Sequence, residues 1–294
     1  MKKTTCIICK SGNVVELNYI PKYKNRYILL KCTECGLKFI VSDNYETLPD
    51  DLYWDDVNKK IYSLHSVINE FREKYNKYLK VLLNYKLPNK NLLEIGSGCG
   101  IFLKFATDSG IDSIGFEPSK IAADMSRSNY NANIVCGYLT RDSDVRKDFG
   151  IVTAWDVIEH VENPVEFVNI CGDHLADGGV FLLETPDESS LIRKLITIVM
   201  RVKRIFHVNS SSNIYYPSHR YYFTHKSIIR LLNDAGFTNI IFYKGHSIYS
   251  KSYAKYKFYK KYSAFKMLKY KFIFFILRFP LFWNKQIVIC EKNH

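Results

Sequence analysis

The stretch LLEIGSGCGIFLKF, residues 92–105, constrains the fold of this chain more than any other. An apolar run ends in three glycines at alternate positions, and apolar residues then resume with helical spacing. A strand that turns through glycines into a helix presents bare backbone and a helix N-terminus to a ligand. The stretch therefore predicts a cofactor-binding turn, with a plain tight turn as the alternative.

The segments after residue 91 alternate between short apolar strands and helical patterns. Strands that are apolar throughout and separated by helices are typical of a parallel sheet covered on both faces. The sequence predicts an α/β, doubly wound, Rossmann-like domain over residues 91–294, with basic insertions at 188–223 and 248–284. A cysteine-rich module at 1–45 and a helical linker at 46–90 precede it.

The composition of the turn distinguishes between two classes of cofactor. A dinucleotide turn needs a small residue where this chain has Ile101. Glu94, at the entry to the turn, would repel a pyrophosphate but can accept hydrogen bonds from a cationic, hydroxyl-rich ligand. Glu117, at the end of the next predicted strand, is placed to bind the two hydroxyls of a ribose. The turn favours S-adenosylmethionine over NAD.

Several motifs within residues 91–187 resemble those of class I S-adenosylmethionine-dependent methyltransferases. LLEIGSGCG is similar to their first motif, GFEPS to their second-strand acid, FGIVTAWDVIEHVENP to their fourth strand, and LADGGVFLLETPD to their fifth. PSHRYYFTHKSIIRLLNDAGF resembles a segment of the subgroup that includes ubiquinone-type and glycan-modifying methyltransferases. The resemblance implies a seven-stranded sheet in which the last strand, KQIVICEKN, lies antiparallel beside FTNIIFYKG.

The same resemblance implies a set of cofactor-binding residues. Glu94 and the turn glycines would contact the methionine and ribose portions, Glu117 the ribose hydroxyls, and the segment around Gly137 the adenine. Asp156 follows the fourth strand and would face the site of methyl transfer, although Trp155 before it is bulkier than is usual in the family. The full set is Glu94, Gly96, Ser97, Gly98, Gly100, Glu117, Pro118, Gly137, Tyr138, Leu139 and Asp156.

Two cysteine pairs near the N-terminus have the spacing of a zinc ribbon. Cys6 and Cys9 form one pair, and Cys32 and Cys35 form the other. Four thiolates at this spacing indicate a tetrahedral zinc site, with four unpaired thiols as the alternative. Because sulfur would fill every position, the zinc would be structural.

Methyl transfer is an in-line displacement that depends on alignment more than on acid or base. An alcohol acceptor still benefits from a general base, a role that suits histidine. We select His219 and His160 as candidates, with Asp156 beside them and Tyr222 as an alternate; packing or capping is the competing interpretation for each histidine.

Charge is distributed unevenly along the chain, which carries a formal net charge of +13. Residues 1–188 hold 22 Lys and Arg against 27 Asp and Glu, whereas residues 189–290 hold 19 against the single acid Asp234. LIRKLITIVMRVKRIFHV has apolar residues at helical spacing with basic residues between them, a pattern typical of helices that lie on an anionic membrane. The longest apolar stretch, at 272–283, is too short to span a bilayer.

Together these features predict an S-adenosylmethionine-dependent enzyme. We expect it to O-methylate a cell-surface glycan, a lipid-linked saccharide or a polar lipid intermediate. The N-terminus has no apolar segment typical of a signal peptide, so we expect the enzyme in the cytoplasm. Its basic apolar segments predict a position peripheral to the inner face of the membrane. One alternative is an RNA methyltransferase that grips phosphates with its ribbon and basic surface. Another is a non-catalytic S-adenosylmethionine-binding scaffold.

Overall fold

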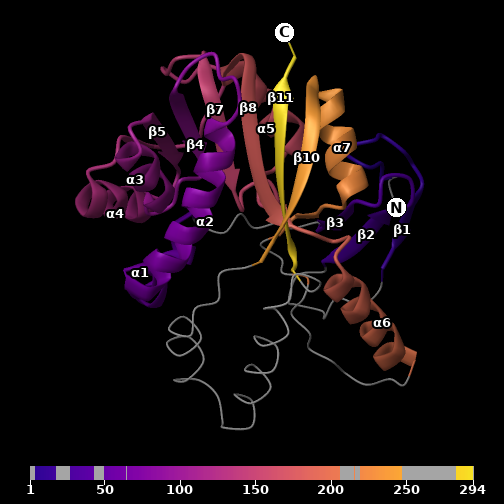
Figure 1. The fold of residues 1–294 in the computed structure, drawn as a ribbon. Coiled ribbons are helices and arrows are strands. Elements are labelled where there is room, and N and C mark those ends of the chain that lie inside the picture. Colours follow the sequence, from indigo (N-terminus) through magenta and orange to yellow (C-terminus); the bar gives the residue numbers. More distant parts are fainter. Residues whose placement is uncertain are drawn as a thin grey trace.

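Seven strands form the central sheet, in the order β10-β11-β8-β7-β4-β5-β6 (Figure 1). The computed structural model describes residues 4–17, 27–42, 50–63, 65–205, 215, 219–246 and 283–293. The strands of this sheet are β4 (Asn91–Ile95), β5 (Asp112–Glu117), β6 (Ile134–Cys136), β7 (Phe149–Trp155), β8 (Leu175–Pro186), β10 (Phe237–Gly245) and β11 (Lys285–Lys292).

The five strands from β4 to β8 run parallel, while β11 lies antiparallel between β8 and β10. The doubly wound fold and the antiparallel last strand are therefore confirmed. In register, Ile95 of β4 pairs with both Phe116 of β5 and Ala154 of β7. The carboxyl ends of these three strands consequently lie at the same edge of the sheet, where ligands bind in open α/β folds.

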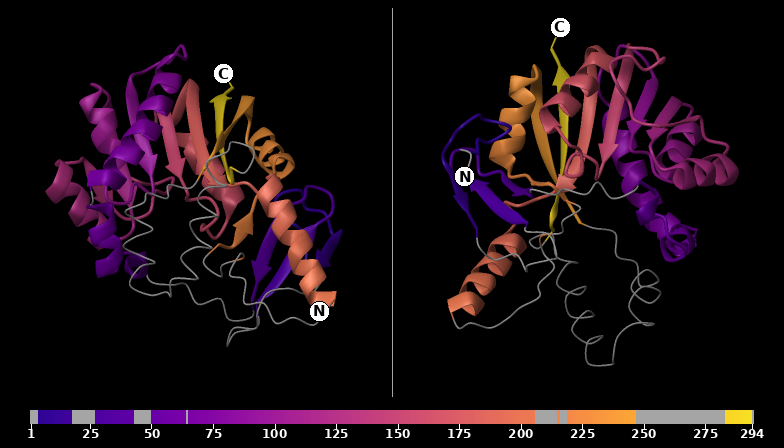
Figure 2. Two further views of the ribbon diagram at one scale, coloured as in Figure 1. Left: turned by 60° about the horizontal axis from the view of Figure 1, so that its bottom comes forward. Right: turned by 180° about the vertical axis from the view of Figure 1, so that it is seen from behind.

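Helices cover both faces of the sheet (Figure 2). One core contains residues of α2 (His65–Leu83) and α3 (Ile101–Asp108), and α4 (Lys120–Tyr130) contacts β5 and β6 beside it. The other core contains residues of α5 (Pro164–His174) and α7 (His225–Asp234). Strand β7 is buried along its whole length, as expected for a strand covered on both faces.

The segment predicted as a helical linker contains helices that pack on the rest of the chain. After the short 3-10 helix η1 (Asp50–Tyr53) and α1 (Asp56–Tyr62), α2 packs on α3. Tyr75, Leu79 and Leu82 of α2 are buried in the core. The helix therefore supplies apolar surface that covers the sheet.

A second, antiparallel sheet has the order β1-β2-β3-β9. Its first three strands are β1 (Val14–Glu16), β2 (Ile28–Cys32) and β3 (Lys38–Val41), all from the cysteine-rich module. The fourth, β9 (Tyr221–Tyr222), comes from the predicted insertion at 188–223 and pairs Phe39 with Tyr221. The N-terminal module therefore takes its last strand from a segment almost two hundred residues later in the chain.

Helix α6 (Leu191–Ile205) extends away from the body of the molecule (Figures 1 and 2). It lies below the antiparallel sheet β1-β2-β3-β9, which we call the ribbon sheet. Among the described residues, no helix combines the length and the apolar composition needed to cross a bilayer. Most of the second basic insertion, 248–284, lies outside the described residues, so the prediction made for it stays a prediction.

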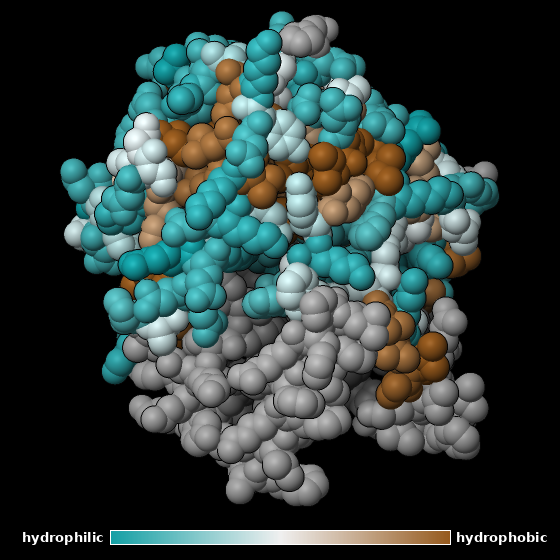
Figure 3. All heavy atoms as spheres, in the orientation of Figure 1, coloured by the Kyte–Doolittle hydropathy of each residue, from teal (hydrophilic) through white to brown (hydrophobic). Residues whose placement is uncertain are grey.

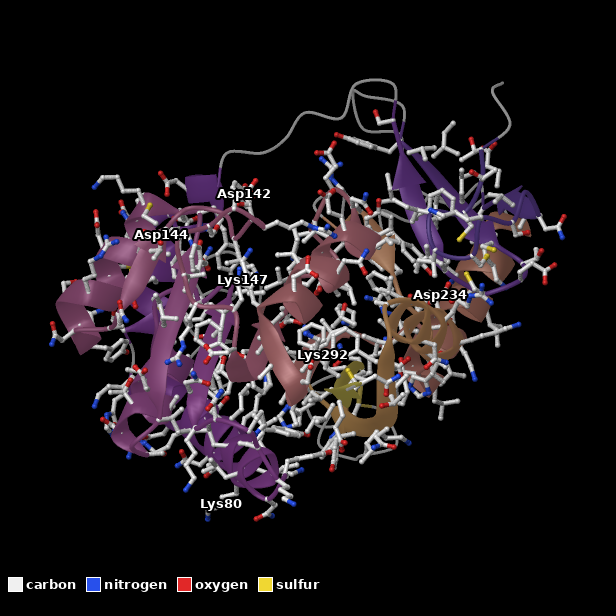
Figure 4. All side chains as sticks on the ribbon, turned by 90° about the horizontal axis from the view of Figure 1, so that it is seen from above. Lys80, Asp142, Asp144, Lys147, Asp234 and Lys292 are labelled. Atoms are coloured by element: carbon white, nitrogen blue, oxygen red, sulfur yellow. The ribbon has the colours of Figure 1, made fainter. Side chains whose placement is uncertain are left out.

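Charged side chains lie at the edge of the central sheet opposite the carboxyl ends of its parallel strands (Figure 4). Asp142, Asp144 and Lys147 lie on the connection from β6 to β7, and Asp234 lies on α7. All four are exposed, and this edge carries no feature that the prediction of function uses.

Candidate functional site

The glycine turn begins at the carboxyl end of β4 and is fastened to the neighbouring strand. The backbone N–H groups of Gly96 and Ser97 donate to the carbonyl of Phe116 at 2.8 and 3.1 Å. Gly96 and Gly98 have φ values of 68° and 53°, in the left-handed region that favours glycine. The Gly98 N–H donates to Oε2 of Glu117 at 2.8 Å, so the turn is tied to the predicted ribose-binding acid.

Gly100 and Ser97 have structural roles that the resemblance did not indicate. A Cβ at Gly100 would lie 1.9 Å from Oγ of Ser126, which places Gly100 at the contact between α3 and α4. The Ser97 side chain is buried, its hydroxyl 3.4 Å from the Phe116 carbonyl. These two residues therefore contribute to packing and turn support, and their place in the cofactor lining stays a prediction.

Glu94 is a buried acid next to the turn. It is 2% exposed, and within the described part of the chain its Oε2 has no hydrogen-bond partner. Burial, and then the negative charge of Glu117, raises the pKa of Glu94 well above its usual range. An acceptor atom of this kind, buried beside an open turn, suits a ligand that brings a hydrogen-bond donor.

Glu117 lies at the end of β5 with both carboxylate oxygens engaged. Oε1 accepts from the N–H of Ser119 at 2.9 Å, and Oε2 accepts from Gly98. Each oxygen keeps a second lone pair, so the carboxylate can still accept from hydroxyls. This arrangement fixes the orientation of the acid relative to the turn.

The start of the predicted helical linker covers the turn, a role that the sequence analysis did not predict. Asp51 of η1 accepts from the Ser119 hydroxyl at 2.5 Å and from the N–H of Ile121 at 3.2 Å. Trp54 is buried, and its ring would lie 3.3 Å from a Cβ at Gly98. The only sequence signal was an aromatic pair between acids in DDLYWDD, which carries no periodicity.

The predicted adenine-binding segment has unfilled space beside it at Gly137. Nothing lies within 4 Å of the position that a Cβ would take at Gly137. The Gly137 N–H donates to the Glu117 carbonyl at 3.0 Å, while Tyr138 is 67% exposed and Leu139 is buried. Pro118, partly buried, lies between Glu117 and the cap of α4. Together with the bare turn and the unsatisfied Glu94 oxygen, this open segment fits a nucleoside cofactor.

A cluster of charged side chains lies at the carboxyl ends of β7 and β8, beside the turn. A Cβ at Gly96 would meet Val157, the residue after Asp156, so turn and cluster are in contact. Lys285 of β11 forms an ion pair with Asp156, and Lys74 of α2 forms one with Glu184 of β8. Asp156 keeps 44% of its side chain exposed, whereas that of Glu184 is 1% exposed.

The charges in this cluster shift one another's pKa values. Burial raises the pKa of Asp156, but the positive charges of Lys285 and Lys74 outweigh it and hold the pKa below its usual value. For Lys285 burial lowers the pKa, and Asp156, Glu184 and Glu159 together raise it above the usual range. Glu159 is different, because burial and the charge of Asp156 raise its pKa to about 8.

Trp155 lies beside this cluster and packs against the helices that cover the sheet. It is 7% exposed and its ring packs against Tyr75 and Phe102. The Lys74 ammonium lies 4.6 Å from the Trp155 ring centroid, a cation–π contact. The unusual bulk of this residue is thus used in packing the helical layer.

The two candidate histidines meet at the same place. The rings of His160 and His219 are edge to face with centroids 4.6 Å apart. Burial, and then His160 and Lys285, holds the pKa of His219 well below its usual range, so its imidazole is neutral at pH 7. The structure brings this pair together with Asp156, whose charge acts on His219.

Tyr222, the alternate candidate, lies next to His219 and is buried. The centroids of the two rings are 5.8 Å apart. Tyr222 is 1% exposed and packs in a cluster with Leu29, Ile40 and Tyr215 beside the N-terminal sheet. Its selection as a catalytic residue stays a prediction.

The four cysteines of the N-terminal module converge. Sγ of Cys6 lies 3.6 Å from that of Cys35, and Sγ of Cys9 lies 3.5 Å from that of Cys32. All four sulfur atoms lie within 4.8 Å of one another. Zinc–sulfur bonds of about 2.3 Å in a tetrahedron place the sulfurs roughly 3.8 Å apart, so this donor set fits zinc.

Three charged residues of the cluster were missed by the sequence analysis. Glu184 carried a signal, since it is a single acid in the apolar strand GVFLLETP. Lys74 and Lys285 carried none, because lysines are common in this chain and only the fold brings these two to the site.

Comparisons with known proteins agree with this arrangement. A family described as "Methyltransferase domain" matches residues 68–240. Ubiquinone biosynthesis O-methyltransferase of Nitrobacter winogradskyi is 34% identical over 104 residues, which cover 34% of this chain and 40% of that protein. The chain thus spans about two-fifths of the length of the curated relatives it matches.

Two solved structures share the fold. An S-adenosylmethionine-dependent methyltransferase of Archaeoglobus fulgidus has a TM-score of 0.52 at 18% identity, over 82% of this chain and 100% of that one. Phosphoethanolamine N-methyltransferase 2 of Haemonchus contortus, in complex with S-adenosyl-L-methionine, has a TM-score of 0.57 at 12% identity, over 95% and 71% of the two chains.

Proposed function

The chain belongs to the methyltransferase domain family, and from this premise we propose that it transfers a methyl group from S-adenosylmethionine to a hydroxyl oxygen of a lipid-borne acceptor. The observation that carries the proposal is the contact between two parts of one site. The glycine turn with Glu94 and Glu117 lies directly against the segment that bears Asp156 and His160, and the ring of His160 contacts that of His219.

The cofactor would be held by groups that surround the turn. We assign the backbone of Gly96 and Gly98 and the carboxyl of Glu94 to its amino-acid and ribose portions, and Glu117 to the ribose hydroxyls. The open segment at Gly137 would receive the adenine. When bound, the cofactor supplies a methyl group already activated by a sulfonium.

The protein's own contribution is alignment and removal of a proton. The acceptor oxygen forms a bond to the methyl carbon as the methyl–sulfur bond breaks, and the hydroxyl proton leaves at the His160–His219 pair. A neutral imidazole, such as that of His219, is able to accept it. Asp156 is paired with Lys285 and oriented by its N–H, which donates to the Glu184 carbonyl at 3.0 Å.

Two observations support the proposal that the acceptor is a hydroxyl oxygen carried by a lipid. The name of the Nitrobacter relative specifies O-methylation in ubiquinone biosynthesis, and this relative aligns with a third of the chain. Helix α6 also carries exposed apolar side chains, which Figure 3 shows gathered at the lower right. They are Leu191, Leu195, Ile198 and Val199.

Helix α6 suits contact with a membrane surface. Ile196 on its other side packs beneath the ribbon sheet, so the helix is held by one face while the apolar stripe stays exposed. Lys194 is exposed beside that stripe. Apolar side chains flanked by lysine bind the interface of anionic bilayers. We therefore propose that α6 brings the site to a membrane that carries the acceptor.

The test is transfer of label from S-adenosylmethionine to lipid, glycan and RNA extracts of the source cell. We expect label in the chloroform-soluble fraction, and a methyl ether on the product by mass spectrometry. Label in a water-soluble glycan would move the acceptor to a saccharide, and label in RNA would replace this proposal. Cofactor binding without any transfer would favour a scaffold.

Membrane contact is tested separately by sedimentation with vesicles of phosphatidylglycerol. Leu195→Asp with Ile198→Asp should abolish sedimentation, while Ile241→Asp, an exposed apolar position on β10, serves as the matched control. Equal sedimentation of the wild type, the double variant and the control would contradict the role of α6.

A further inference from the structure

We propose that Arg193 binds a phosphate of the acceptor, so that the substrate class is a lipid whose hydroxyl lies beside a phosphate group. This inference rests on the proposed function, from which it takes the lipid-borne hydroxyl and the role of His219. Arg193 lies in the first turn of α6, and its side chain is 11% exposed. Its contacts join α6, the ribbon and the histidine pair.

Helix α6 presents Arg193 on the side opposite its exposed apolar stripe. Successive residues of a helix are about 100° apart, so Arg193 shares a side with Ile196 and faces away from the stripe. Ile196 packs against the cluster that contains Tyr222, in agreement with this division. An interfacial helix inserts its apolar face at the acyl boundary and keeps its opposite face among the headgroups. In the proposed membrane contact, Arg193 therefore lies at the level of the lipid phosphates.

The acid nearest to Arg193 is shared with a lysine of the ribbon. Nζ of Lys38 donates to Oε1 of Glu188 at 2.5 Å, whereas Nε of Arg193 lies 3.8 Å from Oε2. The hydroxyl of Tyr215 also donates to Oε1, at 2.8 Å. Lys31 lies opposite Lys38 in the pairing of β2 with β3. Two lysines and Arg193 thus surround the one carboxylate of Glu188, and this excess of positive charge favours an anionic ligand.

Two aromatic rings hold the guanidinium of Arg193 in place. Its Cζ lies 5.8 Å from the ring centroids of both Tyr215 and Tyr222, a distance at which a ring attracts a cation. The guanidinium is a planar fork of N–H donors, and its geometry matches two oxygens of a phosphate. The rings therefore fix a group suited to phosphate at a defined position beside the site.

A phosphate at this position also assists the proposed proton transfer. The ring of Tyr222 contacts both Arg193 and His219, with 5.8 Å between the centroids of the tyrosine and the histidine. Burial lowers the pKa of His219, and Arg193 is one of the nearby cations that lower it further. His219 gains a positive charge when it accepts the hydroxyl proton, and a neighbouring cation opposes that gain. A phosphate bound to Arg193 offsets the opposing charge, which favours acceptors that carry one.

Short-chain lipids below their micelle concentration test the site without methyl transfer. The probes are dihexanoyl-phosphatidylglycerol, whose hydroxyl-bearing headgroup is attached to a phosphate, and dihexanoylglycerol, which lacks the phosphate. In calorimetric titrations we expect the wild type to bind the phospholipid at least about tenfold more tightly. This preference should disappear in Arg193→Met. Arg193→Lys should retain part of it, because the charge remains while the planar fork is lost.

The fold should tolerate loss of the arginine. In Arg193→Met, Glu188 keeps its hydrogen bonds from Lys38 and Tyr215, so no buried carboxylate loses its partner. An unchanged melting temperature checks this point. Lys80→Met is the matched control, because it removes an exposed lysine from α2.

Equal affinity of the wild type for both lipids, or an unchanged preference in Arg193→Met, would overturn the phosphate site. Inorganic phosphate that binds as tightly as the phospholipid would assign the site to a free anion and overturn the lipid class. If the preference depends on Arg193 but no lipid is labelled in the transfer assay, the proposed function fails and the phosphate site stands. If lipid is labelled and Arg193→Met changes neither KM nor kcat, the phosphate site falls and the proposed function stands.

Discussion

The hydroxyl of Thr224 donates a hydrogen bond of 2.9 Å to the backbone carbonyl of Cys35, 189 residues earlier in the chain. Thr224 is also the N-cap of α7, where its hydroxyl accepts from the N–H of Ser227 at 3.2 Å. One hydroxyl therefore joins a cysteine knuckle of the ribbon to the first turn of a helix that covers the central sheet.

Replacing Thr224 by valine should lower the stability of the whole protein. Valine keeps the shape of the side chain but removes both hydrogen bonds, and loss of an N-cap alone costs about 1–2 kcal/mol. Thr224→Ser retains the hydroxyl and is the control, so its melting temperature should stay close to that of the wild type. Equal melting temperatures of the valine and serine variants would contradict the role of this hydroxyl.

Loss of the four-cysteine site, which we propose to hold zinc, should damage methyl transfer much more than cofactor binding. Strand β3 of the ribbon pairs with β9, just after His219, whereas the glycine turn is covered by η1 and Trp54. Displacing an acceptor-side group by about 1 Å can reduce a rate by roughly a hundredfold. We expect a loss of this size in Cys9→Ser, with cofactor affinity changed less than about threefold.

Zinc content, calorimetric titration with S-adenosylmethionine and the transfer assay provide the measurements for this variant. Cys136→Ser is the matched control, since Cys136 is an exposed thiol outside the ribbon. A parallel loss of cofactor affinity and transfer in Cys9→Ser would mean that the ribbon supports the entire fold, rather than the acceptor side.

Alanine variants of two glycines with nearly equal φ values distinguish the energetic cost of steric crowding from that of backbone strain. Gly100 has φ 79° and Gly110 has φ 77°, but only at Gly100 would a Cβ collide, with Ser126. Gly110→Ala should cost about 1–2 kcal/mol, the ordinary penalty for left-handed backbone. Gly100→Ala should cost about 1–3 kcal/mol more, because α3 and α4 must move apart. Urea denaturation of both variants compares them, and equal losses would remove Gly100 from that contact.

Replacing Lys74 by methionine should be strongly destabilising, because it leaves Glu184 buried without its partner. Breaking one side of a buried ion pair typically costs about 3–5 kcal/mol. The double variant Lys74→Met with Glu184→Gln should recover a large part of that loss, since the uncompensated charge is gone. A double-mutant cycle by urea denaturation measures the coupling, and additive losses would show that the pair contributes little.

Glu94→Gln should stabilise the cofactor-free protein in a pH-dependent way. Burial and Glu117 raise the pKa of this carboxyl in the folded state, so the wild type loses stability as pH rises above the unfolded value of about 4.5. Glutamine does not titrate. The difference in free energy of unfolding should therefore be near zero at pH 4 and grow toward pH 8.

Urea denaturation at several pH values measures this difference, and a constant gap would contradict it. The same variant should bind S-adenosylmethionine more weakly, because the buried oxygen no longer attracts a cationic donor; a loss of about tenfold corresponds to 1.4 kcal/mol. Gain of stability with loss of affinity is the combination expected of a binding residue.

The strands of the central sheet and the glycine turn were predictable because each is encoded locally. The glycines stand at fixed offsets from the end of β4, and β7 is an apolar run long enough to be read as a buried strand. The paired knuckles Cys6–Cys9 and Cys32–Cys35 carry their own spacing signal. In these places neighbouring residues determine the structure.

The charged cluster could not be found in the same way. Lys74, Asp156, Glu184 and Lys285 come from four separate elements, and no interval in the chain relates them. The surroundings of Tyr222 could not be predicted either, because an aromatic residue near a candidate histidine is equally compatible with a site and with a core. In the structure its ring lies 5.8 Å from that of His219 and also packs against Leu29 and Ile40 of the N-terminal module.

The pairing of β9 with β3 also has a consequence for biosynthesis. When the ribbon leaves the ribosome, the edge of β3 is open and remains so until residues 221–222 have been made. An open strand edge readily pairs with other chains. We therefore expect a nascent or truncated chain that ends before residue 221 to be prone to aggregation, even with zinc bound, and the ribbon to be a poor module for transplantation into other proteins.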